Sequence, residues 1–261
     1  MRYHEVSEAE SGTMTLQQNV SLEFRDVSMV FPDGTRALDG VSLSIAPGEF
    51  VTVVGPSGCG KSTLLRIASN LESATSGSCA VDRDSIGYVF QDATLMPWRT
   101  VRRNVELIAE LHGVPRTDRT ERASRAIDLV GLNGFEEKYP RQLSGGMRMR
   151  ASLARSLVMQ PKVFLFDEPF GALDEITRER LNDELMSLFQ TQGFAGLFIT
   201  HSIAEAVYMS TKVLVMSARP GRITAQIDIP FGFPRTHDLR YEPRFGELCA
   251  EVSHALRGAH A

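Results

Sequence analysis

Long apolar runs are missing from this chain of 261 residues. Its longest hydrophobic stretches, such as Val163–Phe166, have the length of a β-strand, whereas a membrane span needs about 18 to 20 consecutive apolar residues. We therefore expect no membrane-crossing segment. The start of the chain also lacks the basic residues and apolar block of a secretory signal and carries Glu5, Glu8 and Glu10 instead. Residues 1–19 are predicted to form a flexible N-terminal tail.

Cysteine is scarce, and an excess of positive charge is absent. Cys59, Cys79 and Cys249 lack CxxC spacing, which argues against a disulfide framework and a zinc site and favours a reducing cytosol. Lysine and arginine total 28 against 32 acidic residues, and the net charge of −4 lacks the dense basic footprint of proteins that bind nucleic acid. We expect no nucleic-acid partner. No internal repeat is found, which excludes tandem copies of one domain.

The patterns that are present predict an α/β fold. Apolar residues alternate at Leu22 and Phe24 and again from Val41 to Ile45, which is typical of half-buried antiparallel strands. Phe50–Val54 reads as a strand covered on both faces. Further short apolar runs are separated by helical patterns, which indicates an α/β core. These runs are Ile86–Phe90, Val163–Phe166, Leu197–Thr200 and Val213–Met216.

Helical patterns dominate two other parts of the chain. Strand signals vanish between Asp92 and Leu143, where helices are predicted from Val101 to His112 and from Asp118 to Val130, each followed by a glycine. This predicts a helical subdomain inserted into the α/β core. Near the end of the chain, apolar residues at intervals of three and four predict an amphipathic helix packed on the domain. They are Phe245, Leu248, Cys249, Val252 and Leu256.

The segment from Gly55 to Ser62 fits the phosphate-loop pattern G-x-x-x-x-G-K-[ST]. It lies between the buried strand and a helix predicted from Lys61 to about Asn70, which is the context that the motif requires. Glycines let N–H groups point at a β-phosphate, Lys61 brings charge toward the β- and γ-phosphates, and the Ser62 hydroxyl can ligate Mg²⁺. The alternative is a chance glycine turn. The predicted nucleotide-binding residues here are Gly55, Pro56, Ser57, Gly58, Cys59, Gly60, Lys61, Ser62 and Thr63, with Cys59 a bystander rather than a redox switch.

Two further segments gain meaning beside this loop. A predicted buried strand ends in Asp167 and Glu168, where apolar walls and a metal could make two carboxylates chemically useful, although such a pair can also cap a turn. Leu143–Met147 reads Leu-Ser-Gly-Gly-Met before a strong helical pattern. Alone, that segment indicates an N-cap serine followed by a glycine turn.

Together these segments resemble the ATP-binding proteins of ABC transporters, and the resemblance covers nearly the whole chain. Gln91 after a strand, Ala172-Leu173-Asp174 and His201 after another strand follow in the family's order. The resemblance implies an α/β fold, a P-loop NTPase cassette with a mixed β core, an antiparallel β subdomain and an inserted helical subdomain. It places the ATPase domain at residues 20–240, the helical subdomain at about 92–160 and the C-terminal amphipathic helix at 241–261.

The resemblance also implies an ATPase with ATP and Mg²⁺ as its cofactors. Asp167 would hold the metal, usually through water, and Glu168 would orient or deprotonate the attacking water. Phe31 lies where the family places an aromatic ring that stacks on adenine, with a core phenylalanine as the alternative. Gln91 would link metal and water to the permease interface, and His201 would contact the γ-phosphate. The implied catalytic residues are Glu168, His201, Gln91 and Lys61, and the implied metal ligands are Ser62, Gln91 and Asp167.

One chain carries one phosphate loop and one Leu143–Met147 segment, which the family calls its signature. In the family, the signature of one subunit covers the nucleotide of the other, so the resemblance implies a homodimer within a transporter complex. The residues at the junction would be Ser144, Gly145, Gly146 and Asp174. The implied partners are membrane permease subunits and, indirectly, a periplasmic solute-binding protein, at the cytoplasmic face of the inner membrane. Met147 in place of the commoner Gln, and Phe170-Gly171 in place of Leu-Ser, depart from the family pattern and affect fine tuning.

Three segments indicate the kind of transporter. Leu95–Trp98, the signature and Ser217–Ile223 together resemble the importer ATPases for nitrate, sulfonate, taurine and related small solutes. The alternatives are an ABC exporter or lipid-transport ATPase and a soluble ABC ATPase, although a DNA-repair member would need coiled-coil heptads that are absent here. Trp98, the single tryptophan, is either a permease contact or a core anchor. The transported solute is not specified by this sequence.

Overall fold

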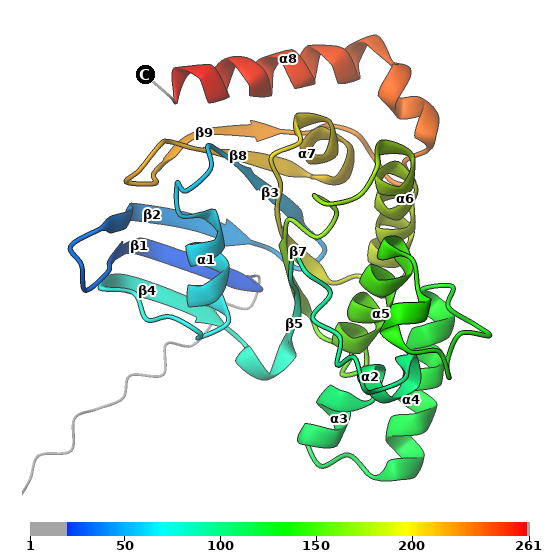
Figure 1. Cartoon of the computed structure of the whole chain (residues 1–261). Helices are drawn as coiled ribbons and strands as arrows, with labels where there is room; N and C mark the ends of the chain where they lie inside the picture. Colours follow the sequence, from blue (N-terminus) through cyan, green and yellow to red (C-terminus); the bar gives the residue numbers. More distant parts are fainter. Residues whose placement is uncertain (1–19, 260–261) are drawn as a thin grey trace, which may run out of the picture.

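Two β-sheets organise the part of the chain that the computed structural model describes, residues 20–259 (Figure 1). One sheet has three antiparallel strands in the order β2-β1-β4, and the other has six in the order β5-β6-β7-β3-β8-β9. Neighbours in the larger sheet are parallel except β8 and β9. The predicted mixed core and antiparallel subdomain are confirmed. The strands are β1 (Leu22–Val30), β2 (Arg36–Ile45), β3 (Phe50–Val54), β4 (Ser76–Val81), β5 (Ile86–Val89), β6 (Val163–Asp167), β7 (Ala195–Ile199), β8 (Lys212–Met216) and β9 (Ile223–Asp228).

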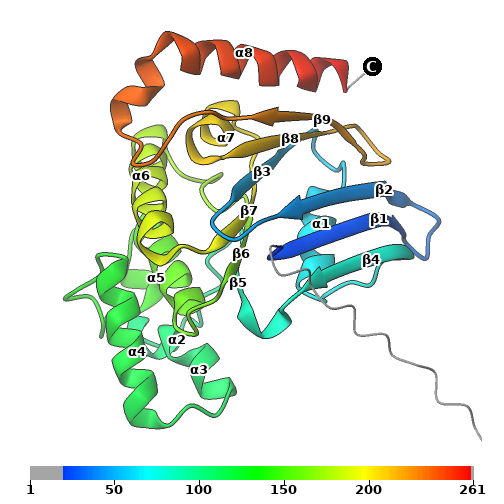
Figure 2. The same ribbon diagram turned by 180° about the vertical axis from the view of Figure 1, so that it is seen from behind.

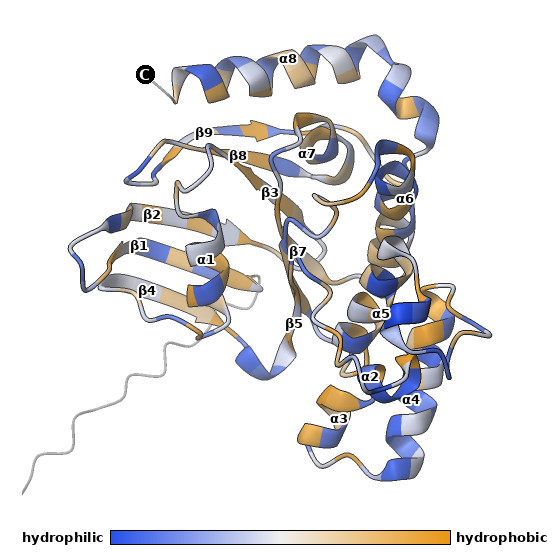
Figure 3. Cartoon of the chain, in the orientation of Figure 1, coloured by the Kyte–Doolittle hydropathy of each residue, from blue (hydrophilic) through white to orange (hydrophobic). Residues whose placement is uncertain are grey.

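The larger sheet divides its side chains between two hydrophobic cores, as expected for strands covered on both faces. On β6, Phe164 and Phe166 belong to one core, whereas Val163 and Leu165 belong to the other. The first core gathers phenylalanine rings, and the centroid of Phe50 lies 5.9 Å from that of Phe166. The second core is shared with the three-stranded sheet. The central strands accordingly carry the hydrophobic colours of Figure 3.

Helix α1 (Lys61–Ala68) lies between the two sheets and contacts β4, β6 and β7. Leu64 and Leu65 are fully buried there. The helix starts just after β3, which sits in the middle of the larger sheet between β7 and β8. In open α/β sheets, ligands bind beyond the carboxyl ends of such strands. The helix ends earlier than predicted, because Asn70 adopts a left-handed φ of 60°.

The other helices pack mainly around the first core (Figure 2). Helices α2 to α5 fill the segment between β5 and β6, α6 and α7 follow β6 and β7, and α8 comes last. Short 3₁₀ turns occupy Arg83–Ser85, Pro140–Gln142 and His237–Tyr241. The helices are α2 (Val101–Val105), α3 (Leu107–Leu111), α4 (Arg116–Leu129), α5 (Gly145–Leu157), α6 (Glu175–Gln192), α7 (Ile203–Met209) and α8 (Pro243–Gly258).

The helix predicted from Val101 to His112 is wrong in one respect, because the segment is divided into α2 and α3. Glu106 separates the two helices while keeping helical angles of φ −61° and ψ −19°. Its carboxylate is buried and accepts hydrogen bonds from Arg103 and from Thr120 of α4. Apolar periodicity reports which face is buried and does not report such a local interruption.

Helix α8 packs on α7, β8 and β9, as its apolar spacing predicts. Phe245, Leu248 and Val252 are buried. Arg240, in the turn before the helix, lies over the ring of Tyr208 from α7 and donates a hydrogen bond of 3.1 Å to Asp183 of α6. No helix within residues 20–259 is long and apolar enough to cross a membrane. The predicted tail at 1–19 falls outside the described residues.

Candidate active site

A pocket of about 390 Å³ opens beyond the carboxyl end of β3. Its walls come from the segment after β1, the start of β2, the loop and first turn of α1, and the ends of β5 and β6. Sequence positions from 31 to 219 therefore meet at one cavity. The residues that line it are Phe31, Ala37, Ser57, Gly58, Gly60, Lys61, Ser62, Thr63, Gln91, Glu168 and Arg219.

Glycine is required at Gly60, the residue that precedes α1. Its φ of 103° is a conformation that side-chain-bearing residues rarely adopt. A Cβ there would also lie 2.7 Å from Leu38 and 2.8 Å from the carbonyl oxygen of Ala37. The tight turn brings the first N–H groups of α1 to the pocket. Free N–H groups at a helix N-terminus are suited to bind an anion such as phosphate.

Lys61 is buried beneath this loop rather than extended into solvent. Its ammonium donates hydrogen bonds to the carbonyl oxygens of Gly55 at 2.9 Å and of Pro56 at 3.0 Å. An ammonium has three donors, and the third N–H of Lys61 makes only a long contact of 3.9 Å with the weak acceptor Cys59 Sγ, which a ligand in the pocket can replace. Cys59 lies behind the loop and is buried, with its thiol pKa raised chiefly by burial. This geometry gives Cys59 a packing position and Lys61 a fixed positive charge.

The two carboxylates at the end of β6 take different positions. Asp167 accepts a hydrogen bond of 2.8 Å from the hydroxyl of Ser62, and Tyr88 lies 3.5 Å from its other oxygen. Burial raises the pKa of Asp167, and the nearby charge of Glu168 adds to the rise, while the Ser62 hydrogen bond lowers it in part. Asp167 thus faces the first turn of α1, and Glu168 lines the pocket.

Glu168 is held against His201, which follows β7. The distance between Glu168 Oε2 and His201 Nδ1 is 3.2 Å. Glu168 has a φ of 46°, an uncommon value for a residue with a side chain, and its own N–H donates to the carbonyl of Ile199. Such backbone strain is found where the surrounding structure fixes a functional residue. The predicted catalytic pair therefore meets within hydrogen-bond reach.

Two lining residues, Ala37 and Arg219, were not predicted as part of the site. Arg219 donates hydrogen bonds of 3.1 and 3.0 Å to the carbonyl oxygen of Gly58, so it braces the phosphate loop from the side of β8. Phe31 lines the same cavity and is only half-buried, which separates it from a simple core phenylalanine. The Ser217–Ile223 segment marked Arg219 in the sequence, but nothing in its pattern showed that it folds back onto Gly58.

Nine of the predicted site residues do not line this pocket. Five of them contact residues that do, namely Gly55, Pro56, Cys59, Asp167 and His201. The other four lie farther along the chain, in the signature and at the start of α6. Within the described part of the chain, Ser144, Gly145, Gly146 and Asp174 are absent from its lining. Ser144 caps α5 by accepting from the N–H of Met147. Asp174 caps α6 by accepting from the N–H of Thr177, and that hydrogen bond is the main cause of its lowered pKa. The signature instead lies beside the start of α6, because a Cβ at Gly145 would lie 3.2 Å from Leu173, and one at Gly146 would lie 3.2 Å from Thr177.

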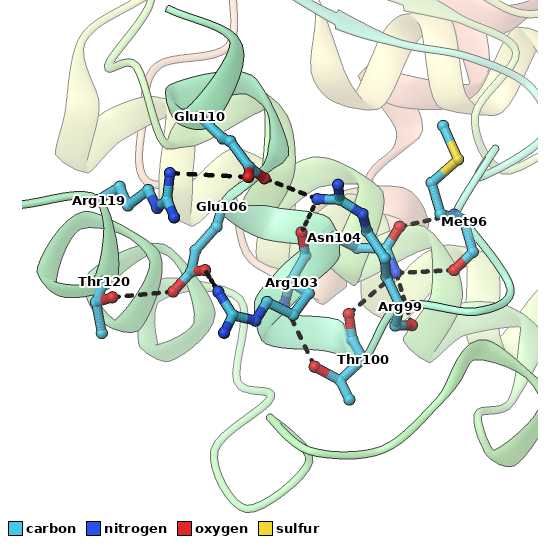
Figure 4. A network of polar contacts seen from close by, with 9 residues as sticks. All are labelled: Met96, Arg99, Thr100, Arg103, Asn104, Glu106, Glu110, Arg119 and Thr120. Atoms are coloured by element: carbon cyan, nitrogen blue, oxygen red, sulfur yellow. Dashed lines mark hydrogen bonds and ion pairs between the residues drawn. The ribbon is translucent and has the colours of Figure 1, made fainter. Parts of the chain in front are cut away.

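The backbone of the segment that carries Trp98 is hydrogen-bonded to a buried side-chain amide, that of Asn104 (Figure 4). Asn104 has no exposed surface; it accepts from the N–H of Met96 at 2.7 Å and donates to the carbonyl oxygens of Met96, Arg99 and Thr100. Trp98 itself is 72% exposed. The alternative of a core anchor is therefore wrong for Trp98, because a rigid backbone presents the ring outward.

Comparisons with known proteins agree with this geometry. The family model described as ABC transporter matches residues 38–171. The nitrate import ATP-binding protein NrtD of Synechocystis is 43% identical, with 91% of this chain and 95% of the relative covered. The taurine import ATP-binding protein TauB of Rhizobium johnstonii is also 43% identical (83% and 87% covered). The aliphatic sulfonates import ATP-binding protein SsuB 1 of Pseudomonas syringae is 42% identical (87% and 92% covered).

Solved structures give the same result for the fold. The ATP-binding cassette MJ0796, in a dimeric post-hydrolysis state bound to ADP and Pi, is 31% identical with a TM-score of 0.70, covering 81% of this chain and all of that one. The protein cbiO1 from Clostridium perfringens, part of the transporter complex cbiONQ, is 27% identical with a TM-score of 0.76 and covers 89% of this chain and all of its own. By its phosphate loop, its paired carboxylates and these matches, the chain belongs to the ATP-binding ATPases of the ABC transporter family.

Proposed function

We propose that this ATPase works as a pair of identical chains that energise a membrane permease importing a small solute. The observation that carries the proposal is the incomplete pocket. One chain supplies the phosphate loop, Gln91 and Glu168, but its signature turn lies elsewhere, beside α6. A second copy that brings its Ser144 and glycine N–H groups over the open side would complete the cavity. The dimeric, ADP-bound relative supports this arrangement.

The residues present fit Mg²⁺ bound together with ATP. Ser62 and Asp167 bring a hydroxyl and a carboxylate oxygen to within 2.8 Å of each other beside the phosphate loop. Mg²⁺ prefers oxygen ligands and is often held by one or two protein groups together with substrate phosphates and water. When bound, the ion would offset negative charge on the β- and γ-phosphates. Gln91 lines the same cavity and is the third ligand that we assign.

The protein groups then divide the work of hydrolysis. Lys61, fixed by two loop carbonyls, exchanges its long contact with Cys59 Sγ for a hydrogen bond to the phosphates. Glu168 orients the attacking water and accepts its proton on a carboxylate oxygen. His201, at 3.2 Å from that carboxylate, contacts the γ-phosphate and keeps Glu168 in place. Loss of the γ-phosphate removes the contact that favours the closed pair, so hydrolysis opens the dimer.

The exposed segment around Trp98 is the surface that we assign to the permease. It follows Gln91, so a shift at the nucleotide can reach the membrane partner through a short stretch of backbone. With such a contact the chain would work at the cytoplasmic face of the membrane, and a solute-binding protein would act on the other side. Relatives named for import of nitrate, taurine and aliphatic sulfonates support a small solute that carries a nitrate or sulfonate group.

The experiment that tests import joins genetics with uptake. The chain is expressed with candidate permeases from the same genome, and uptake of labelled nitrate, taurine and an alkanesulfonate is measured in cells that lack their own systems. We expect ATP-dependent uptake of one of these solutes and none with Lys61→Ala. Efflux of a preloaded compound, or a chain that never copurifies with a membrane protein, would contradict an importer.

A further inference from the structure

A buried carboxylate lies behind the catalytic histidine, outside the pocket already described. Glu205, in the first turn of α7, is 5% exposed and does not line the cavity that holds Glu168. Buried carboxylates are rare because an ionised group loses its hydration, so each one requires an explanation. Glu205 follows His201 by four residues in the sequence, and the loop between them is short.

The start of α7 departs from the usual capping box. Ser202 caps the helix and accepts from the N–H of Glu205 at 3.3 Å. In a capping box, the acidic residue at that third position accepts in return from the N–H of the cap residue. Here the N–H of Ser202 donates instead to the hydroxyl oxygen of Thr200 at 3.0 Å. The carboxylate of Glu205 accepts a hydrogen bond from the hydroxyl of the same Thr200.

The Thr200 hydroxyl therefore serves two partners, one on each side of His201. It accepts from the residue after the histidine and donates to the buried carboxylate. A side-chain hydroxyl that closes a turn in this way can rotate about its C–O bond unless a second partner orients it. Glu205 supplies that orientation from the protein interior. The hydrogen bonds of the Thr200 hydroxyl to Ser202 and Glu205 thus fix the backbone on both sides of His201. We call these two hydrogen bonds the relay.

The surroundings of Glu205 join it to the loop that follows Glu168. Burial raises the pKa of Glu205, and the nearby charge of Arg178 is among the groups that lower it in part. Arg178 in turn donates to the carbonyl oxygens of Phe170 at 3.4 Å and Leu173 at 2.8 Å. In residues 20–259, Oε1 of Glu205 and Oδ1 of Asn182 are buried without a hydrogen-bond partner. The Glu205 carboxylate is therefore held through Oε2, by the Thr200 hydroxyl.

We propose that Glu205 is a positioning residue that acts through Thr200 to fix His201 against Glu168. The inference rests on the catalytic role proposed above for His201 and deepens it. A group that acts through another has no further effect once that other group is removed, which a double-mutant cycle measures. A residue that only stabilises α7 would lower the stability of the chain and affect turnover equally in both backgrounds.

The test compares Glu205→Leu, Glu205→Gln and Thr200→Val, each with His201 intact and in a His201→Ala background. Leucine removes the acceptor at similar volume, glutamine keeps an acceptor oxygen, and valine removes the hydroxyl at the other end of the relay. We expect Glu205→Leu and Thr200→Val to lower kcat by about tenfold or more with KM for ATP unchanged, as for loss of an interaction that acts in the transition state. Glu205→Gln should stay within about threefold of the natural chain, because a neutral acceptor suffices for the Thr200 proton.

The expected cycle shows no further loss of kcat when Glu205→Leu or Thr200→Val is added to His201→Ala. Equal losses in both backgrounds, or a Gln variant as impaired as the Leu variant, would overturn the proposal. A second readout does not need turnover: the imidazole C–H resonance of His201, assigned by its absence in His201→Ala, should move in Glu205→Leu and Thr200→Val. An unmoved resonance overturns the positioning role. An inert natural chain with a moved resonance contradicts the hydrolytic function alone.

Discussion

The hydroxyl of Ser62 donates a 2.8 Å hydrogen bond to Asp167, although 105 positions separate the two residues in the chain. The contact joins the first turn of α1, which follows β3, to the end of β6, and β7 separates β3 from β6 in the sheet order. It also keeps the two proposed oxygen ligands together, and Tyr88 contacts the other oxygen of Asp167. Partial burial of the Asp167 carboxylate lowers the stability of the folded chain when this group is ionised, and that loss of stability can be measured.

Asp167→Asn is expected to make the nucleotide-free chain more stable at neutral pH. Folding raises the pKa of Asp167, so the folded chain holds that proton more tightly than the unfolded chain does. Its contribution to stability is therefore full below the ordinary pKa of about 4 and is lost as the pH rises through the raised value. At pH 7 the ionised group opposes folding. Asparagine keeps an acceptor for Ser62 and carries no charge.

Thermal unfolding in EDTA at two pH values checks this prediction. We expect the Asn variant to melt about 2 to 4 °C above the natural chain at pH 7, the shift that about 1 kcal/mol produces in a chain of this size. The difference should shrink near pH 4. Affinity for magnesium nucleotide should fall at the same time, with Ser62→Ala as the matched control at the other ligand. A lower melting temperature for Asp167→Asn at pH 7 would contradict the argument.

Glu168→Gln should separate nucleotide binding from hydrolysis. Glutamine preserves the side-chain size and an oxygen near His201 but cannot accept the proton of water. We expect turnover to fall by about 100-fold or more, the range for loss of a general base, while ATP binding is kept. Size-exclusion chromatography with light scattering should show a dimer with ATP and single chains with ADP. Unchanged hydrolysis would remove Glu168 from its role, and a monomer with ATP would exclude the paired site.

Phe31→Ala should weaken ATP binding without changing kcat. The ring lines the pocket opposite the phosphate loop, where it would stack on the base. Loss of one aromatic contact of about 0.5 to 1.5 kcal/mol corresponds to a roughly 2- to 10-fold higher Kd. Phe31→Tyr keeps the π face and should bind like the natural chain. Equal affinity for ATP and for inorganic triphosphate in the natural chain would count against base stacking.

Asn104→Ala should loosen the Trp98 segment, which we assign to the permease, while leaving the active site intact. The substitution removes a buried amide that serves the backbone of Met96, Arg99 and Thr100. Each buried backbone group left without a partner costs about 1 to 3 kcal/mol, so the segment is expected to rearrange. Trp98 is the single tryptophan, and its fluorescence anisotropy reports that segment alone.

We expect lower anisotropy and weaker copurification with the permease in Asn104→Ala, with ATP affinity within about twofold of the natural chain. Trp98→Phe serves as the control for the partner contact, since it removes one indole and leaves the amide network in place. An Asn104→Ala chain that retains both the anisotropy and the permease would show that Asn104 supports only its own helix.

Much of the fold follows from local patterns, and its exceptions have local causes. The buried strand Phe50–Val54 and the helix at Lys61 were predicted because hydrophobic runs and the glycine loop are strong signals. Strand β4, with Ser76, Gly77 and Ser78, and the polar β9 were not predicted. They are strands because neighbouring strands offer hydrogen bonds, and a single-sequence pattern contains no record of that pairing.

The site also divides into residues that the local sequence marks and residues that only long-range contacts bring to it. The phosphate-loop pattern located Lys61, and the family resemblance marked Glu168 and His201, each just after a recognisable strand. Neither located Arg219 at the phosphate loop or Glu205 behind the histidine. A long-range contact such as Arg219 to Gly58 depends on how β8 and β9 return to the sheet, which no local spacing encodes. Glu205 stands at the third position after an N-cap serine, a pattern that indicates a capping box. The pattern does not indicate that its carboxylate is bonded to Thr200 instead.

The packing of the signature turn on its own chain has a consequence for the assembly. Gly145 lies against Leu173, in the loop that leads away from Glu168, and Gly146 lies against Thr177 at the start of α6. A nucleotide held by one copy would press on the other copy's turn and, through Leu173, on that copy's hydrolytic loop. Binding of nucleotide in either cavity would then change the affinity of the other. The paired sites would therefore respond to ATP concentration as one cooperative unit rather than as two independent ones.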